Sequence, residues 1–180
     1  MNLRWQRLEP DGEHGRIAET RGLEAGRVLK RDPADYLLEI PGWLLLVYLV
    51  YAQAIPAFDY ELGVRMGTQE PATRITEVGV AFWYGFAFAD LVIYMPLLGL
   101  GLIGCWRRSS WWRPVLGAAL GITVYWPVVV LAAAVDARDA AGWNIDDADY
   151  WVVLQAIALW AAWGLLRVAF YWNDQTGKDA

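Results

Sequence analysis

Residues 76–105 have the sequence TEVGVAFWYGFAFADLVIYMPLLGLGLIGC, and this stretch decides the class of fold. Asp90 is the only charged residue between Glu77 and Arg107. A helix needs about 20 mostly apolar residues to cross the hydrocarbon core of a bilayer, so this stretch predicts one membrane-spanning helix with residues to spare. The composition agrees, because 57% of the 180 residues are hydrophobic and only 19% are charged.

Three other apolar runs are long enough to cross a bilayer, and they cover residues 41–58, 114–135 and 150–172. We therefore predict an all-α integral membrane protein whose four-helix bundle comprises residues 38–172. A polar, basic tail precedes it at residues 1–37, with a candidate surface helix near residues 17–31, and a second tail follows at residues 173–180. Asp32 and Pro33 favour a helix start, since aspartate is a common N-cap and proline a common first helical residue.

The charges outside the apolar runs predict the direction of the four crossings, because Lys and Arg are retained on the cytoplasmic side of a membrane. Twelve of the fifteen Lys and Arg fall in the N-terminal tail, the connection between the second and third runs, and the C-terminal end. The other side holds only Arg65, Arg74 and Arg138, beside nine Asp and Glu. We therefore expect a multi-pass protein of a cell or inner membrane with both termini in the cytoplasm.

Asp90 is the main candidate for a functional residue inside the membrane. It lies about fourteen residues into the second run, which at about 1.5 Å per residue places it near the middle of the bilayer. Burial away from water disfavours an ionised carboxylate, so we expect Asp90 to be largely neutral and able to donate a hydrogen bond. Two hypotheses stay open: a hydrogen bond between helices that only fixes their packing, or a group that binds a ligand, an ion or a proton.

Other polar and aromatic residues are expected near Asp90. Helical spacing places Trp83, Asp90 and Tyr94 on one face of the second helix. Thr123 lies at a similar depth in the third span, so a protonated Asp90 is a candidate to bond it, and Pro127 cannot donate to the Thr123 carbonyl. Two glutamines, one in the first span and one in the fourth, extend this polar track towards the outer side. The candidate binding or proton-site residues are Asp90, Tyr94, Thr123, Trp83, Gln53 and Gln155.

Two glycine patterns predict close helix packing. Gly117-x-x-x-Gly121 in the third span is typical of small-residue packing, which we expect within the molecule rather than between copies. Gly99-x-Gly101-x-x-Gly104 matches the letters of a dinucleotide-binding fingerprint, but it lies inside an apolar helix and no strand precedes it. We interpret it as a second close-packing stripe.

The residue inventory excludes several classes of function. His14 is the only histidine and lies in the tail, so a haem or zinc site with a histidine ligand inside the membrane is excluded. Cys105 is the only cysteine, so the chain has no disulfide or cysteine pair of its own. Neither catalytic residues nor a metal site are predicted. Nucleic-acid binding has no support, since the net charge is −5 and the basic residues lie where topology requires them.

Three functional hypotheses follow. The preferred one is a non-enzymatic protein that binds a small or lipid-like ligand, or serves as an accessory subunit of a membrane complex. No resident cofactor is predicted, but the many aromatic residues in the spans suit an apolar ligand such as a lipid or quinone. The second is a proton- or cation-linked transporter or channel subunit with Asp90 as the titrating group, and the third a membrane enzyme acting on a lipidic substrate. The expected partners are the lipid bilayer, other membrane subunits and further copies of the chain.

Overall fold

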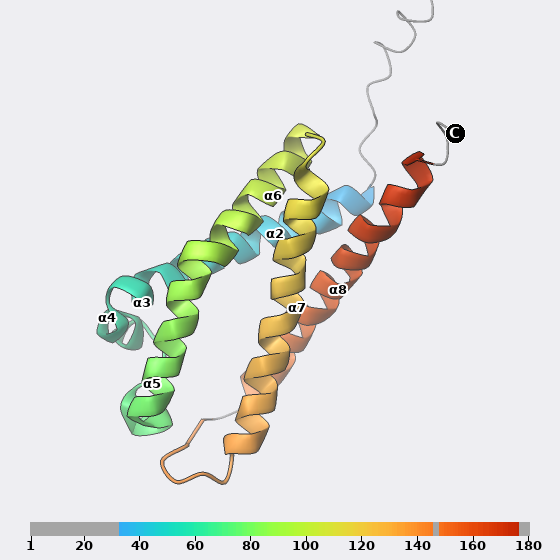
Figure 1. Cartoon of the computed structure of the whole chain (residues 1–180). Coiled ribbons are helices and arrows are strands. Elements are labelled where there is room, and N and C mark those ends of the chain that lie inside the picture. The colour runs from blue at the N-terminus through green and yellow to red at the C-terminus, as the bar shows by residue number, and fades with distance from the viewer. Residues whose placement is uncertain (1–32, 146–147, 177–180) are drawn as a thin grey trace, which may run out of the picture. The chain divides into compact units, whose positions relative to one another are not determined.

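The computed structural model describes residues 33–145 and 148–176, and every regular element among them is helical. The predicted basic tail lies outside the described residues as far as residue 32. Two of the elements, η1 and η2, are single π-helical turns inside longer helical runs (Figure 1). In chain order the elements are α2 (Pro33–Leu49), η1 (Val50–Ala54), α3 (Ile55–Phe58), α4 (Tyr60–Arg65), α5 (Ala72–Ala89), η2 (Asp90–Tyr94), α6 (Met95–Arg107), α7 (Trp112–Ala137) and α8 (Ala148–Thr176).

Four helical stretches are long and apolar enough to cross a membrane, as predicted: Pro33–Phe58, Ala72–Arg107, Trp112–Ala137 and Trp151–Phe170. The helices are longer than the apolar runs that predicted them. The first begins at Pro33, so residues 33–37 belong to a helix, and α8 continues through residues 173–176 of the predicted C-terminal tail. The reason is that polar residues at a helix end lower the hydropathy without interrupting the backbone hydrogen bonds.

Thr76, the predicted first residue of the second span, lies at a kink in α5. Its φ of 67° is a left-handed conformation that β-branched residues rarely adopt. The Thr76 hydroxyl accepts a hydrogen bond from the backbone N–H of Gly79 at 3.4 Å, which is the arrangement of a helix N-cap. The straight, apolar part of the second span therefore starts at this residue.

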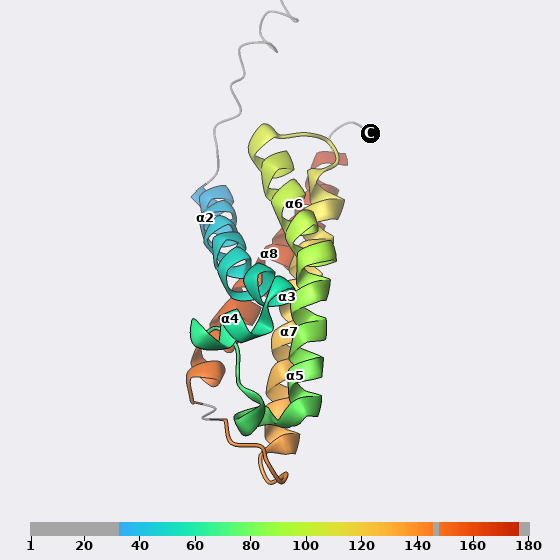
Figure 2. The same ribbon diagram turned by 90° about the vertical axis from the view of Figure 1, so that its left-hand side faces the viewer.

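The residues from Tyr36 onward form one compact unit. Within it, α6 lies beside α7, and α7 lies beside α8 (Figures 1 and 2). The core is apolar and centres on the contact between α6 and α7, where leucines from both helices are completely buried. These leucines are Leu98, Leu102, Leu116 and Leu120, and Leu49 of α2 is equally buried.

The close contact between helices is made at Gly101 rather than at the predicted Gly117-x-x-x-Gly121 pattern. A Cβ atom added to Gly101 would lie 2.8 Å from the Leu116 Cα, so the backbones of α6 and α7 approach as closely as glycine allows. A Cβ on Gly121 would meet nothing within 4 Å, and one on Gly117 would meet methyl groups of Val168 at 3.7 Å and Leu165 at 4.0 Å, which are ordinary contacts. Gly101 belongs to the second predicted stripe, Gly99-x-Gly101-x-x-Gly104, whereas of the third-span pattern Gly117 lies against α8 and Gly121 meets no neighbour. The spacing of small residues does not say which face a neighbouring helix covers.

The three arginines on the predicted outer side all lie at one end of the unit and are paired with acids. The connections at this end are joined by a hydrogen bond from the Asn144 N–H to the Arg74 carbonyl, at 2.8 Å. Such exposed pairs contribute little to stability, but they neutralise every basic residue here. The ion pairs are Arg65–Asp59 at 3.9 Å, Arg74–Glu70 at 3.2 Å and Arg138–Asp139 at 3.3 Å.

Candidate functional site

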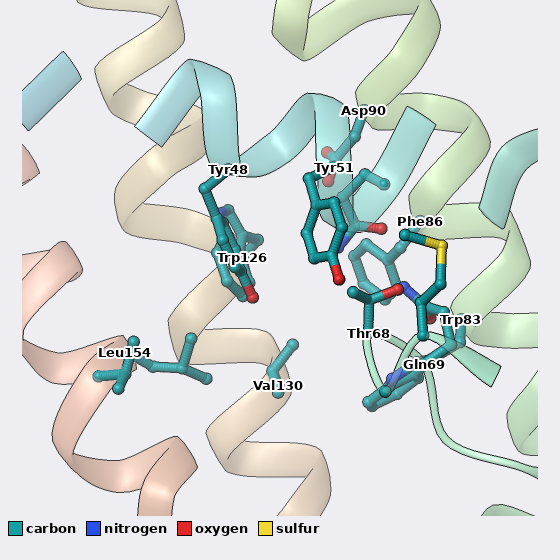
Figure 3. Close-up of a pocket in the computed structure, with 14 residues that line it drawn as sticks. Tyr48, Tyr51, Thr68, Gln69, Trp83, Phe86, Asp90, Trp126, Val130 and Leu154 are labelled. Atoms are coloured by element: carbon teal, nitrogen blue, oxygen red, sulfur yellow. The ribbon is translucent and has the colours of Figure 1, made fainter. Parts of the chain in front are cut away.

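A cavity of about 370 Å³ lies among all four long helical stretches (Figure 3). Its volume is in the range of small-ligand sites. The first helical stretch, the segment of residues 66–69, α5 with η2, α7 and α8 each contribute to its wall. The lining residues are Tyr48, Tyr51, Gln53, Met66, Gly67, Thr68, Gln69, Trp83, Phe86, Asp90, Trp126, Val130, Val153 and Leu154.

Asp90 lies in the middle of the helical run Ala72–Arg107, at the first residue of η2, and lines the cavity. Its side chain points in the direction of Tyr51 and the cavity (Figure 3). Only 9% of the residue is exposed, yet within residues 33–145 and 148–176 its carboxyl group makes no side-chain hydrogen bond or ion pair. A carboxyl group that faces a cavity inside an apolar helical unit and has no side-chain partner is a natural anchor for a ligand.

The hydrogen bond between the second and third long helical stretches is made by Tyr94 instead of Asp90. The Tyr94 and Thr123 hydroxyl oxygens are 2.6 Å apart, and both residues are buried. Thr123 also donates to the carbonyl of Ala119 at 2.8 Å, so Tyr94 acts as the donor in the pair. The Tyr94–Thr123 hydrogen bond therefore joins the two helices without Asp90, and the Asp90 side chain lines the cavity.

Aromatic rings form much of the cavity wall, with five among the fourteen lining residues. Trp83 packs edge-to-face against Phe86, with ring centroids 6.4 Å apart, and against Trp143, with centroids 6.2 Å apart. Such contacts hold an aromatic side chain in one orientation. Asp90 is the only Asp, Glu, Lys, Arg or His among the lining residues. The cavity thus presents one carboxyl group in an aromatic wall.

Gln69 lines the cavity in the segment of residues 66–69. Its side-chain Nε2 donates a buried hydrogen bond to the carbonyl oxygen of Ala52 in η1, with a donor–acceptor distance of 2.8 Å. Pro56 has no N–H to offer the Ala52 carbonyl four residues earlier, so the glutamine replaces the missing helix hydrogen bond. The segment containing Gln69 is thereby attached to the first helical stretch.

The connection between Asp59 and Pro71 is itself held by local hydrogen bonds. The Tyr60 hydroxyl donates to the Glu70 carbonyl at 2.9 Å, and Thr68 donates to the Gly63 carbonyl at 3.2 Å. Burial, with smaller contributions from the Glu70 and Glu61 carboxylates, raises the pKa of Tyr60 to about 12. Tyr60 therefore stays a neutral donor at physiological pH, and the connection keeps its shape over the cavity.

The two π-helical turns pack against each other beside the cavity. Each is followed closely by a proline, Pro56 after η1 and Pro96 after η2. In η2 the N–H of Met95 bonds the carbonyl of Asp90 five residues earlier, in the wider π register. π-Helical turns of this kind are frequent at functional sites, because they redirect side chains without ending the helix. Here they carry Gln53 and Asp90 to the cavity.

The structure brings part of the predicted polar track together. Asp90, Trp83 and Gln53 line the cavity, whereas Tyr94 and Thr123 are buried in the helix contact next to it. Gln155 is exposed on α8 and is not a lining residue, although its neighbours Val153 and Leu154 are.

Sequence reasoning missed Gln69 and a second buried acid, Glu39. Glu39 is 7% exposed in α2, and the Cys105 thiol donates to its Oε1 at 3.5 Å. A signal for Gln69 existed in Pro56, because the same argument that identified the free carbonyl of Thr123 applies to Ala52. Which side chain would satisfy that carbonyl was not visible in the sequence.

No family model, curated protein or solved structure matches this chain. Among the described residues, no three His, Cys, Asp or Glu side chains are grouped so that they could hold a metal ion. The chemistry of the cavity is therefore the basis for a functional proposal.

Proposed function

We propose that this chain is a multi-pass membrane protein that binds a small ligand in the cavity between its four spans, with Asp90 as the polar anchor. The observation that carries the proposal is the buried carboxyl group of Asp90, which faces a cavity and has no side-chain partner in the described part of the chain. A carboxyl group that served only packing would bond a neighbouring helix, as Tyr94 does with Thr123. A cavity lined largely by aromatic and aliphatic residues, with a few polar groups, is the usual form of a small-ligand site, and Asp90 is the only Asp, Glu, Lys, Arg or His in this lining.

Both termini lie in the cytoplasm in this proposal. The support is the segregation of charge, with Arg107, Arg108 and Arg113 in and beside the connection between α6 and α7, and each arginine at the opposite end paired with an acid. The segment of residues 66–69 and the cavity next to it then belong to the outer half of the membrane.

Cysteine labelling tests this orientation. In a Cys105→Ala background, Asp139→Cys is expected to react with a membrane-impermeant maleimide in intact cells, because residue 139 is exposed in an outer connection. Ser110→Cys, equally exposed in the inner connection, is expected to react only after the membrane is permeabilised. Labelling of Ser110→Cys in intact cells, with Asp139→Cys protected, would reverse the proposed topology.

Ligand occupancy is tested by filling the cavity. Val130 is 8% exposed and lines the cavity from α7, so Val130→Phe places a ring in the ligand volume. Val128→Phe is the matched control, since Val128 lies on the same helix, is 59% exposed and does not line the cavity. Native mass spectrometry after purification in mild detergent is expected to show a bound small molecule, near one per chain, in the wild type and in Val128→Phe.

Val130→Phe is expected to lose this molecule while keeping the helical circular dichroism spectrum of the wild type. Two outcomes contradict the proposal. One is a wild-type protein that carries nothing beyond annular lipid, and the other is a bound molecule that Val130→Phe retains in the same amount.

A further inference from the structure

From the cavity's chemistry we infer that its ligand is an organic cation, a protonated amine or a quaternary ammonium group, whose charge is placed against the Asp90 carboxylate. The inference rests on the proposed function and names the chemical class of ligand that the same cavity takes.

The first argument is the charge of the wall. Asp90 is the only ionisable acid or base of the types Asp, Glu, Lys, Arg and His among the fourteen lining residues, so nothing in the wall neutralises its carboxylate. Only 9% of the residue is exposed, and no described side chain bonds or pairs with it. An opposite charge within about 4–6 Å is what favours the ionised form of such a group. An anionic ligand would be repelled, whereas a cation would supply the missing partner.

The second argument separates an organic cation from a divalent metal ion. Calcium takes about 6–8 oxygen ligands and magnesium needs about six in a regular octahedron, mostly carboxylates, carbonyls and water. The cavity offers one carboxyl group, and most of its remaining wall is aromatic or aliphatic. Among the residues that the structure describes there is no grouping of three acids, histidines or cysteines.

The third argument is the aromatic wall itself. Tyr48, Tyr51, Trp83, Phe86 and Trp126 come from the first, second and third spans and surround the space beside Asp90 (Figure 3). Aromatic rings attract cations through their negative faces, and an ammonium group with an apolar body gains both from this attraction and from burial. The edge-to-face contact of Trp83 with Phe86 holds part of the wall in place before a ligand arrives.

The fourth argument is the surface around the cavity's outer end. Between residues 59 and 77 and between residues 136 and 139 the described chain carries six acids, Asp59, Glu61, Glu70, Glu77, Asp136 and Asp139, against three arginines. Each of the three arginines is paired with a different one of these acids. Six negative and three positive charges leave a net charge of −3, which raises the local concentration of cations.

The experiment compares the binding of a cation with the binding of its uncharged isostere. Benzyltrimethylammonium and its carbon isostere neopentylbenzene have the same shape and differ by one positive charge. Binding of each to the full-length protein is measured by isothermal titration calorimetry in dodecyl maltoside, an uncharged detergent, with empty micelles subtracted. Asp90→Asn keeps the shape of the side chain and removes its charge.

We expect Asp90→Asn to weaken binding of the cation by at least about tenfold, as for the loss of a charged partner in a partly buried site, and to leave binding of the isostere within about twofold of the wild type. Unchanged isostere binding also shows that the variant is folded. Glu61→Gln removes one exposed acid of the acidic surface outside the cavity and is the control for net charge; it is expected to weaken binding of the cation by less than about twofold, because salt screens an exposed charge, and to leave binding of the isostere unchanged.

Three outcomes overturn the inference. The first is binding of the cation and the isostere with equal affinity, the second is retention of the cation preference in Asp90→Asn, and the third is no binding of the cation. If Val130→Phe still removes the co-purified molecule in any of these cases, the cavity is a ligand site of another class and the proposed function stands. If Val130→Phe changes neither that molecule nor the probes, the proposed function fails as well.

The cationic group can belong to a soluble amine or to the headgroup of a lipid. A competition experiment distinguishes these two kinds of ligand. Short-chain phosphatidylcholine added during the titration is expected to compete with benzyltrimethylammonium if the cavity accepts a choline headgroup. The absence of competition, with the cation still bound through Asp90, assigns the site to soluble amines.

Discussion

Gly101→Ala is expected to lower the free energy of unfolding by about 2 kcal/mol, although alanine is the better helix former by about 1 kcal/mol. The added methyl group would lie 2.8 Å from the Leu116 Cα and 3.0 Å from its backbone nitrogen. Backbone atoms cannot move aside as the end of a side chain can, so α6 and α7 must separate and loosen the leucines buried between them. The measurement is unfolding in mixed SDS and dodecyl maltoside micelles, followed by near-ultraviolet circular dichroism.

Two other glycines of the same helices provide controls. A Cβ on Gly99 would lie 3.6 Å from a Leu46 methyl, which is an ordinary contact, and a Cβ on Gly121 would meet nothing within 4 Å. Gly99→Ala and Gly121→Ala are therefore expected to leave the unfolding free energy unchanged or to raise it by up to about 1 kcal/mol. Equal effects of all three substitutions would show that α6 and α7 do not meet at Gly101.

Gln69→Ala is expected to destabilise the protein by about 1–3 kcal/mol, because it removes the side-chain donor of a buried hydrogen bond to the carbonyl of Ala52. Gln53→Ala is the matched control. Gln53 also lines the cavity, but its side-chain amide makes no hydrogen bond within the described residues, so the expected loss is below about 0.5 kcal/mol. Thermal unfolding can be followed through a fluorogenic maleimide, since Cys105 is the single thiol of the chain and is buried.

A double-mutant cycle with Pro56→Ala isolates this hydrogen bond. Alanine at position 56 restores a backbone N–H that can donate to the Ala52 carbonyl, so Gln69 is no longer needed there. The change of packing at residue 56 is common to both arms of the cycle. The effect of Gln69→Ala is expected to shrink by about 1 kcal/mol in the Pro56→Ala background. Purely additive effects would show that Gln69 does not compensate for the proline.

The structure separates two roles that a single buried acid could have filled. A hydrogen bond between the second and third long helical stretches joins the hydroxyl groups of Tyr94 and Thr123, while Asp90 faces the cavity. The two residues are four apart on one helical run, but the π register of η2 changes the angle between them. This local change in register makes a ligand site at Asp90 compatible with a firm helix contact one turn away.

The sequence by itself determined the number and approximate positions of the four long helices. Length and hydropathy suffice for this, because a bilayer requires an unbroken apolar run whatever the helices do next. It also identified Asp90 as the exceptional residue, since one carboxyl group in a long apolar run stands out without any knowledge of its neighbours.

Only the tertiary structure decided which residues surround Asp90 and where helices meet. Gln155 shares a predicted depth with Gln53 yet lies on an exposed face, and Gly121 satisfies a packing motif without a partner. Depth follows from counting residues, but the rotation of one helix relative to another depends on all the side chains between them. For the same reason, only the folded chain shows that Gln69, in a connecting segment, donates a hydrogen bond to the carbonyl of Ala52.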